Sequence, residues 1–282
     1  MIDLHTHTWC SDGTLSPSEL VALAKRIGLS AVAVTDHDTV DGLEEALAAG
    51  MRLGIEVIPG VEINLEHEHV TLDMLGYFLD GRPSNELCHQ LARLRSYRDE
   101  RNERILARLA ELGYPVSAEE LALVAGGAAV GRPHIGEALR RRGYVSSISE
   151  AFTRFLRRGA PAFVDRRRLS LAEGVRLLRD SGGLAVVAHP GIIHTDDAGL
   201  RDICARAARA GAVGFECYYS SYSPQTLATC LQLAADFGLV ATGGSDFHGA
   251  TKPAVRLGAG PGGMPIPDHV LADLKERAAA GS

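Results

Sequence analysis

Short apolar runs of strand length recur along this chain and alternate with amphipathic segments of helical length. The runs at 31–35 and 184–188 are almost continuously apolar, as expected for parallel strands that are covered on both faces. The run at 70–78 alternates instead and places Asp73 among apolar neighbours, where a carboxylate needs a cation or hydrogen bonds to offset its burial. The predicted strands lie in the opening residues and at 31–35, 56–64, 70–78, 184–188, 212–217 and 239–242.

Capping signals mark the helices between these strands. Ser16, Asp41 and Ser170 are each followed by Glu three residues later, a capping box that predicts the start of a helix. Gly28 and Gly54 follow the last predicted turns of the first two helices. About seven strands alternating with helices favour a closed barrel over an open sheet. The sequence therefore predicts an α/β fold, a distorted TIM-like (β/α)7 barrel.

The periodicity changes between residues 82 and 168, where no strand pattern is evident. An apolar helical stripe continues to Gly113, but Arg98, Arg101 and Asn102 occupy its central positions. These polar groups form either a local salt-bridge patch or a surface that faces an anionic ligand. Further helices are predicted near 117–125, 133–142 and 147–157. We therefore expect a barrel formed by residues 1–81 and 169–282, with a helical insertion at 82–168 that covers the substrate.

Composition indicates an ordinary globular protein. Of the 282 residues, 46% are hydrophobic and 23% are charged, which makes extensive disorder unexpected. No stretch is apolar enough to span a bilayer, and the N-terminus lacks a secretory signal pattern. The five cysteines are odd in number and include no Cys-x-x-Cys, which favours reduced thiols. We expect a cytoplasmic protein with no membrane association and no obligate protein partner.

Charge is distributed unevenly along the chain. The segment 82–168 holds 17 Arg, no Lys and 10 Asp or Glu, a local balance of +7, whereas the whole chain carries −6. The remaining residues are therefore strongly acidic. This difference predicts an anion-binding surface on the insertion and a cation-binding site on the barrel, although single arginines commonly serve only to solvate helix faces.

Histidine and carboxylate side chains recur near the ends of the predicted strands. His5 and His7 are two residues apart, so in an extended strand they share one face. Each residue alone has an ordinary alternative, such as a helix cap, a turn or a core histidine, but together they indicate a metal site. No cysteine belongs to the set, which suits a hydrolytic cluster of Mn, Zn or Fe better than structural zinc. The candidate ligands are His5, His7, Asp12, His37, Glu62, Asp73, His134, His189, Asp246 and His248.

Five motifs give the chain a family resemblance. They are Asp3-Leu-His-Thr-His-Thr8, Thr35-Asp-His-Asp38, Pro59-Gly-Val-Glu-Ile63, Ala188-His-Pro190 and Gly244-Ser-Asp-Phe-His-Gly249. Together they resemble the polymerase and histidinol phosphatase (PHP) family, a branch of the amidohydrolase superfamily. The insertion with Gly131-Arg-Pro-His134 and the segment from Asp246 to Lys252 are similar to the subgroup of 3′,5′-nucleoside bisphosphate phosphatases, some of which are also 5′-to-3′ exoribonucleases.

The resemblance implies a cluster of two or three divalent ions, with Mn as the first expectation and Zn or Fe as alternatives. One ion is expected at His5, His7, Glu62 and Asp246, and a second at Asp12, His37 and His248. Glu62 is expected to bridge to a third ion, shared with Asp73 and His134. Many members have a His where this chain has Asp73, so the third site is expected to bind less tightly or to prefer a harder ion. His189 either completes a metal shell or acts on the phosphate as a hydrogen-bond donor or general acid.

The resemblance also implies an enzyme that hydrolyses nucleotide phosphate esters. The expected reaction converts nucleoside 3′,5′-bisphosphates, such as adenosine 3′,5′-bisphosphate, to 5′-mononucleotide and phosphate, with short 5′-phosphorylated RNA as a further substrate. The alternatives are histidinol phosphate phosphatase or another PHP phosphoesterase, and a non-catalytic PHP module that binds nucleic acid. Expected phosphate contacts are the segment Asp12, Gly13 and Thr14, and the side chains of Arg98, Arg101, Asn102, Arg132 and Lys252.

Overall fold

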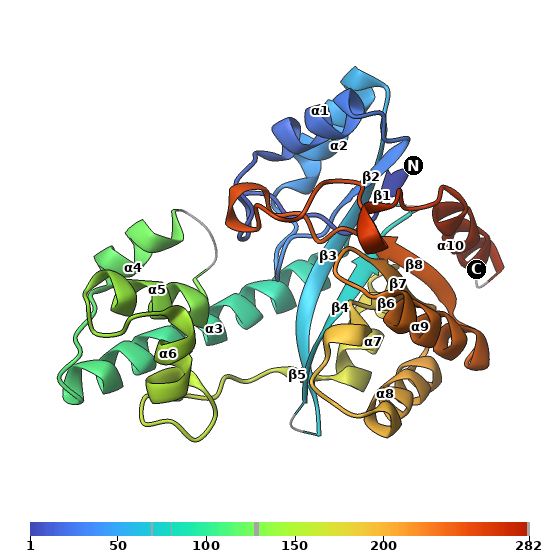
Figure 1. The fold of residues 1–282 in the computed structure, drawn as a ribbon. Helices are drawn as coiled ribbons and strands as arrows, with labels where there is room; N and C mark the ends of the chain where they lie inside the picture. The colour runs from blue at the N-terminus through green and yellow to red at the C-terminus, as the bar shows by residue number, and fades with distance from the viewer. Residues whose placement is uncertain (69, 80, 127–129, 281–282) are drawn as a thin grey trace. The chain divides into compact units, whose positions relative to one another are not determined.

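The chain folds into two compact units. The computed structural model describes residues 1–68, 70–79, 81–126 and 130–280. One unit, the barrel unit, comprises residues 1–89 and 168–282, and the other, the helical unit, comprises residues 90–167 (Figure 1). Each unit is described separately below.

The barrel unit is built on one sheet whose strands nearly close on themselves. Its hydrogen-bonded order is β1 (Ile2–Asp3), β2 (Ala31–Val34), β3 (Glu56–His67), β4 (Val70–Tyr77), β6 (Leu184–Val187), β7 (Gly214–Tyr219) and β8 (Val240–Gly244). The residues after β1 approach those at the end of β8, where Leu4 N donates to Gly243 O (3.3 Å) and Thr6 forms a parallel bridge with Phe247. The predicted α/β barrel is therefore confirmed.

Strand direction departs from a regular β/α repeat at β4. This strand is antiparallel to both β3 and β6. β3 ends at His67 and β4 begins at Val70, which is too short a connection for a helical crossover but suits a hairpin. Because the ladder with β4 continues to His67, β3 is longer than the predicted strand at 56–64, and Glu62 lies in its interior. A short additional strand, β5 (Leu169–Ser170), pairs with β3 and was not predicted.

Helices α1 (Pro17–Arg26) and α2 (Leu43–Leu53) pack their apolar faces on β2, where Leu20, Val32 and Ala46 are fully buried. The predicted capping box at Ser16 is present in α1. The predicted cap at Asp41 is wrong, because α2 begins after Gly42 without a side-chain cap and the Asp41 amide donates to Thr39 Oγ1.

The remaining helices of the barrel unit follow β5, β6, β7 and β8. The Ser170 capping box opens α7 as predicted. The C-terminal helix α10 inserts Val270 and Leu274 into the same core as Ile2 and Leu4. The bounds are α7 (Leu171–Asp180), α8 (Asp197–Ala210), α9 (Pro224–Asp236), α10 (His269–Ala280), and the short 3₁₀ turns η2 (Pro190–Ile192), η3 (Gly249–Thr251) and η4 (Pro261–Gly263).

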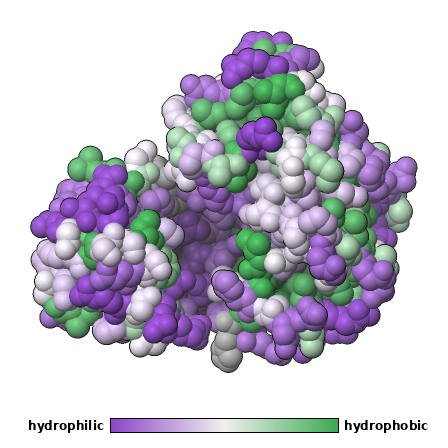
Figure 2. All heavy atoms as spheres, viewed as in Figure 1, coloured by the Kyte–Doolittle hydropathy of each residue, from purple (hydrophilic) through white to green (hydrophobic). Residues whose placement is uncertain are grey.

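The helical unit has a core of its own and, in its described residues, no strand. Ile105, Leu121, Leu139 and Phe155 are among its buried members. Its elements are α3 (Asn85–Glu111, which begins in the barrel unit), α4 (Ala118–Ala125), α5 (Arg132–Arg141), α6 (Ile148–Ala151) and the π-helical turn η1 (Phe152–Leu156). The single helix predicted at 147–157 is therefore divided between α6 and η1. On the face that Figure 2 shows, the surface of this unit is mostly hydrophilic with scattered apolar residues.

None of the helices in the described parts of the chain combines the length and the apolar character that crossing a bilayer requires.

Candidate metal centre

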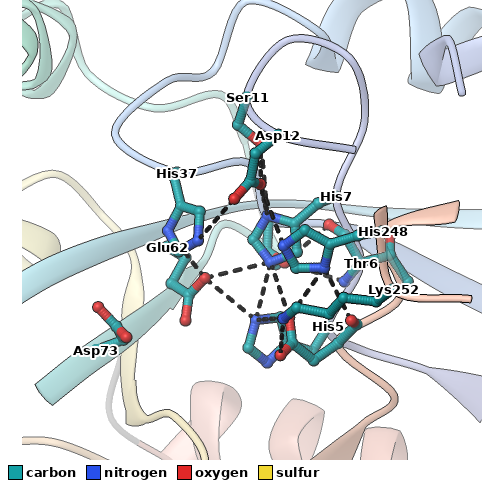
Figure 3. Close-up of polar contacts among 12 residues, drawn as sticks. His5, Thr6, His7, Ser11, Asp12, His37, Glu62, Asp73, His248 and Lys252 are labelled. Carbon is teal, nitrogen blue, oxygen red and sulfur yellow. Dashed lines mark hydrogen bonds and ion pairs between the residues drawn. The ribbon is translucent and has the colours of Figure 1, made fainter. Parts of the chain in front are cut away.

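The residues after β1 bring two imidazoles together. His5 and His7 are fully buried, and their Nε2 atoms are 3.1 Å apart. The backbone that carries them is fixed against the end of β8, because His7 N donates to Phe247 O and Asp246 N donates to His5 O, both at 2.9 Å. Regular strand pairing ends at Asp3, but the alternation continues far enough for both rings to face the same space, as Figure 3 shows.

The loop after His7 delivers Asp12. Its Oδ1 lies 3.1 Å from His248 Nε2, and its Oδ2 lies 3.8 Å from His37 Nε2. Buried Asp36 holds the loop by accepting hydrogen bonds from Thr8 N (2.8 Å), Thr8 Oγ1 (2.6 Å) and Ser11 Oγ (2.5 Å). The loop is thus fixed by side-chain acceptors rather than by regular secondary structure.

Glycine is required at position 13 of this loop. A Cβ atom there would lie 2.3 Å from His7 O, which is a direct clash with backbone. The Gly13 amide donates to Thr8 O (2.9 Å), and the Thr14 amide donates to His248 O (3.2 Å). The sequence predicted that these amides bind a phosphate. In the structure, both donate to backbone oxygens and hold the loop in place. A phosphate would have to displace existing hydrogen bonds to reach them.

Glu62 of β3 lies at the centre of the cluster. Its Oε2 atom is 3.3 Å from His5 Nε2, 3.2 Å from His7 Nε2 and 3.1 Å from His37 Nδ1. The side chain is 1% exposed, yet no described residue forms a hydrogen bond with Oε2. A buried carboxylate oxygen that faces three imidazole nitrogens without hydrogen-bond geometry is the arrangement that a cation would satisfy.

The segment after β8 supplies Asp246 and His248. Asp246 has a positive φ of 60°, a conformation that a non-glycine residue adopts only where the surroundings enforce it. Its Oδ2 accepts hydrogen bonds from Tyr219 Oη (2.8 Å) and Lys252 Nζ (2.7 Å). Its Oδ1 is turned toward the imidazoles, 3.3 Å from both His7 Nε2 and His248 Nδ1. One oxygen is therefore anchored, and the other faces the cluster.

His189 and Asp73 extend the site along Glu62. His189 Nε2 is 3.1 Å from Glu62 Oε1 and 3.8 Å from Asp73 Oδ2. Asp73 Oδ1 accepts a hydrogen bond from Asn64 Nδ2 (2.7 Å), and Asn64 Oδ1 accepts one from Arg168 Nε (2.9 Å). Asp73 therefore faces the cluster from β4 and is held by the neighbouring residue on β3.

The cluster shifts the ionisation of its members in opposite directions. Burial alone would neutralise Glu62, but His37 and His5 hold its pKa well below the usual range. Burial also opposes charge on His7, yet the neighbouring carboxylates of Asp246 and Glu62 raise its pKa to about 10. Asp246 likewise has a lowered pKa beside His5 and His7. The carboxylates of Glu62 and Asp246 are therefore ionised at neutral pH, as metal ligands must be, and a cation that binds here would displace the proton that they hold on His7.

The donor set fits divalent cations. It combines imidazole nitrogens and carboxylate oxygens without a thiolate, which is typical of catalytic rather than structural sites. Three groups in this cluster have ligand atoms within 4.8 Å of one another: His7, Asp12, His37 and His248; His5, His7 and Asp246; and His5, Glu62 and His189. Asp73 lies next to the third group, because its Oδ2 is 3.8 Å from His189 Nε2.

The other predicted residues belong to the helical unit. His134 Nδ1 accepts a hydrogen bond from Gly131 N (3.0 Å), so the neutral ring carries its proton on Nε2, a tautomer suited to donate rather than to coordinate. Arg132 lies over the rings of Phe152 and Phe163, and donates to Leu156 O (3.3 Å). The metal role of His134 stays a prediction, and this hydrogen bond argues against it.

The three polar residues in the stripe of α3 are partly or fully buried. Arg101 is 6% exposed and Asn102 is 5% exposed, whereas Arg98 is of intermediate exposure. Asn102 Nδ2 donates to Val130 O (3.0 Å), which ties α3 to the segment before α5. Two of the three side chains therefore do face inward, as the helical stripe predicts.

Several buried acidic and phenolic groups support the site but were not identified from the sequence. Glu216 contacts His5 and the backbone of His189, and Tyr219 holds Asp246. Asp3 accepts from Ser245 Oγ (2.5 Å) and Gly258 N (2.7 Å). For Glu216 a signal existed, because it is a carboxylate inside an apolar strand run, the same feature that identified Asp73.

Comparisons with known proteins agree with this centre. Residues 3–164 match the PHP domain family. The chain is 33% identical to the 5′-3′ exoribonuclease Rnm of Escherichia coli strain K12 (91% of this chain, 87% of that protein). It is 32% identical to the 3′,5′-nucleoside bisphosphate phosphatase of Chromobacterium violaceum (88% and 87%). The structure of an amidohydrolase from Chromobacterium violaceum with bound sulfate superimposes with a TM-score of 0.83 at 29% identity (98% and 96%).

These relatives are enzymes that cleave phosphate esters, and they match most of the chain rather than one motif. The matched segment begins with the residues that carry His5 and His7 and includes His37, Glu62 and Asp73. Sequence, fold and site geometry thus agree, and the chain belongs to the PHP domain family, as a hydrolase of the phosphatase and phosphodiesterase type.

Proposed function

We propose that this protein is a divalent-metal phosphoesterase that converts nucleoside 3′,5′-bisphosphates to 5′-mononucleotides and phosphate. The observation that carries the proposal is the convergence of three imidazole nitrogens on the buried Oε2 atom of Glu62, at 3.1 to 3.3 Å. The substrate class is taken from the relative named 3′,5′-nucleoside bisphosphate phosphatase.

We infer that two or three ions bind, with Mn²⁺ the first candidate and Zn²⁺ or Fe the alternatives. Compared with the sets expected from the resemblance, the geometry favours His7 as a donor shared between two groups and His189 in the third group beside Glu62. His189 Nε2 lies 3.1 Å from Glu62 Oε1 and 3.8 Å from Asp73 Oδ2, so a cation between these atoms would replace a proton on Nε2, and we assign His189 to the metal rather than to general acid catalysis.

The chemistry that divalent cations supply when bound here is charge stabilisation at phosphoryl oxygens and polarisation of a water for attack on phosphorus. The chain itself supplies orientation. Tyr219 and Lys252 fix Asp246, and Asp36 fixes the loop that carries Asp12. The Lys252 side chain is 41% exposed, so its ammonium can bind a phosphate oxygen in addition to Asp246.

The second phosphate of the substrate requires cationic or amide donors. We assign this role to the side chains singled out in the helical unit, with His134 added as a donor through Nε2. Guanidinium groups pair bidentately with phosphate, which makes them the preferred contacts for a nucleotide with two phosphates. The assigned residues are Arg98, Arg101, Asn102, Arg132 and His134.

A second activity, stepwise removal of nucleotides from 5′-phosphorylated RNA, uses the same phosphoester chemistry. Two observations favour it: the relative named 5′-3′ exoribonuclease at 33% identity, and the excess of arginine in residues 82–168. A terminal 5′-phosphate and the adjoining phosphodiester present the same groups as a bisphosphate, so one site can serve both substrates.

The test is phosphate and nucleotide release by Mn²⁺-reconstituted protein from three substrates: adenosine 3′,5′-bisphosphate, histidinol phosphate, and a short 5′-phosphorylated RNA. We expect the bisphosphate to yield 5′-AMP and phosphate, with elemental analysis showing two or three bound ions. Faster hydrolysis of histidinol phosphate than of either nucleotide substrate would overturn the proposal. So would RNA binding without turnover of any of the three.

A further inference from the structure

Glu216, in the middle of β7, is a fully buried carboxylate that belongs to none of the three donor groups. Its Oε1 and Oε2 atoms lie 3.1 and 3.2 Å from His5 Nδ1. Its Oε2 also accepts a hydrogen bond from the backbone amide of His189 at 2.7 Å. Because a carboxylate that is buried this deeply needs compensation, these two contacts define its role.

The contact with His5 decides which ring nitrogen faces the cluster. An ionised carboxylate only accepts hydrogen bonds, so it keeps a proton on Nδ1 of the imidazole. The Nε2 lone pair then points at Glu62, whose Oε2 atom is 3.3 Å away, and at Asp246, whose Oδ1 atom is 3.7 Å away. Carboxylates in this position are known to orient metal-binding histidines and to raise their basicity.

The contact with His189 acts on the backbone. This residue has φ 28° and ψ 54°, a left-handed conformation that non-glycine residues rarely adopt, and it directly precedes Pro190. The short hydrogen bond to Glu216 stabilises that bend. The bend in turn places His189 Nε2 within 3.1 Å of Glu62 Oε1.

We propose that Glu216 is a positioning residue that sets the His5 tautomer and the His189 backbone together, so that both rings present Nε2 to one metal group. This inference rests on the proposed metal-dependent function. Glu216 on β7 thereby connects His5, which follows β1, with His189, which follows β6. His5 and Glu216 are 211 residues apart in sequence.

The primary test is the Glu216→Gln variant, titrated with Zn²⁺ in the absence of substrate. Its amide NH₂ group would face His5 Nδ1 and favour the opposite tautomer. We expect Zn²⁺ affinity to fall by about 10–100-fold, the range found for such supporting groups. In ¹⁵N spectra of Zn²⁺-loaded protein, wild-type His5 should show a protonated Nδ1 and a zinc-bound Nε2, and the variant should lose this pattern.

Thr242→Val is the matched control. Thr242 is the register partner of Glu216 on β8, is fully buried, and has a side-chain oxygen without a hydrogen-bond partner in the described chain. Its near-isosteric replacement disturbs the same packing but not the imidazoles, so affinity and spectra should match wild type. Unchanged Zn²⁺ affinity and an unchanged His5 pattern in Glu216→Gln would overturn the inference.

Two further measurements separate the remaining outcomes. Glu216→Asp keeps the charge on a shorter side chain and should bind Zn²⁺ with an affinity between those of wild type and Glu216→Gln. If neither variant folds, the wild-type spectrum alone decides, because zinc bound through Nδ1 of His5 contradicts the inference. If wild type binds Zn²⁺ as described but hydrolyses none of the three substrates, the proposed function fails and the role of Glu216 stands.

Discussion

The two units use charged side chains in opposite ways. In the barrel unit, His5 follows β1 and Glu62 lies on β3, and both are at most 1% exposed. In the helical unit, Glu137 binds Arg140 and Arg141 within one helix, and both arginine side chains are about half exposed, at 47% and 58%. The first arrangement needs the whole fold, whereas the second follows from spacing along a single helix.

This difference separates function from stability. Exposed ion pairs contribute little free energy, because water screens them and their long side chains lose entropy. Buried charges cost free energy unless partners compensate them, so a fold retains them where chemistry requires them. The buried cluster is therefore the part of the molecule where substitution should affect activity most, and the surface pairs of the helical unit should affect it least.

The largest expected effect is on Glu62. Replacing it with Gln removes the charge that faces three imidazoles and should lower kcat/KM by about 10³-fold, equivalent to roughly 4 kcal/mol of transition-state stabilisation. Steady-state assays with adenosine 3′,5′-bisphosphate and metal analysis measure the loss. The control Glu137→Gln removes an exposed carboxylate and should stay within about twofold of wild type. Equal losses in the two variants would contradict the comparison.

The second largest expected effect is a loss of thermal stability when metal is removed. Ions that bind only the folded state at 100 times their dissociation constant stabilise it by about 2.7 kcal/mol. Chelation should therefore lower the Tm by about 5–10 °C, as measured by calorimetry with and without Mn²⁺. In Glu62→Gln the shift should be much smaller. A wild-type Tm that does not respond to metal would show that the buried cluster is not a cation site.

The third prediction compares a buried arginine of the helical unit, Arg101, with an exposed one, Arg140. Arg101→Gln, at a buried position of α3, should raise KM for a bisphosphate by about 10–100-fold, the effect of losing a charge-assisted hydrogen bond. The KM for a 3′-monophosphate should change far less. Arg140→Gln, at the surface, is the control and should change neither value. If both KM values rise equally for Arg101→Gln, the residue is structural rather than phosphate-binding.

The smallest effect concerns acid stability of the helical unit. Hydrogen bonds from Ser146, and then Arg154, lower the pKa of Glu150 to about 2 from 4.5. Because the folded-state pKa is lowered, its contribution is present above pH 4.5 and is lost as the pH falls toward 2. Wild type should exceed Glu150→Gln in Tm by a small margin at about pH 6. Thermal scans at about pH 6 and about pH 2 should show that margin disappearing.

The sequence predicted those features that depend on local pattern. Capping boxes at Ser16 and Ser170 fixed two helix starts, and both are present. The helical character of the insertion followed from its 3.6-residue period. His5 and His7 share one face because alternation is a local property of extended chain. The family resemblance could be recognised from the sequence because each of the five motifs is a short contiguous segment.

Prediction failed where long-range pairing decided the outcome. Nothing in the composition of β4 says that it runs antiparallel to β3 and β6, and that reversal pairs Glu62 with Leu75. The predicted cap at Asp41 did not form, since α2 begins one residue later, after Gly42. The phosphate contacts expected at Gly13 and Thr14 stay predictions, but no local pattern indicated that their amides donate to the backbone oxygens of Thr8 and His248.

The sequence by itself determined which donor atoms this protein has, and which of its segments are strands or helices, because residue chemistry and periodicity are local. Only the tertiary structure decided that Glu62 lies within reach of three imidazoles and that Glu216 holds His5 and His189. Those relations depend on register and barrel closure between residues up to 211 positions apart, and no local pattern encodes them.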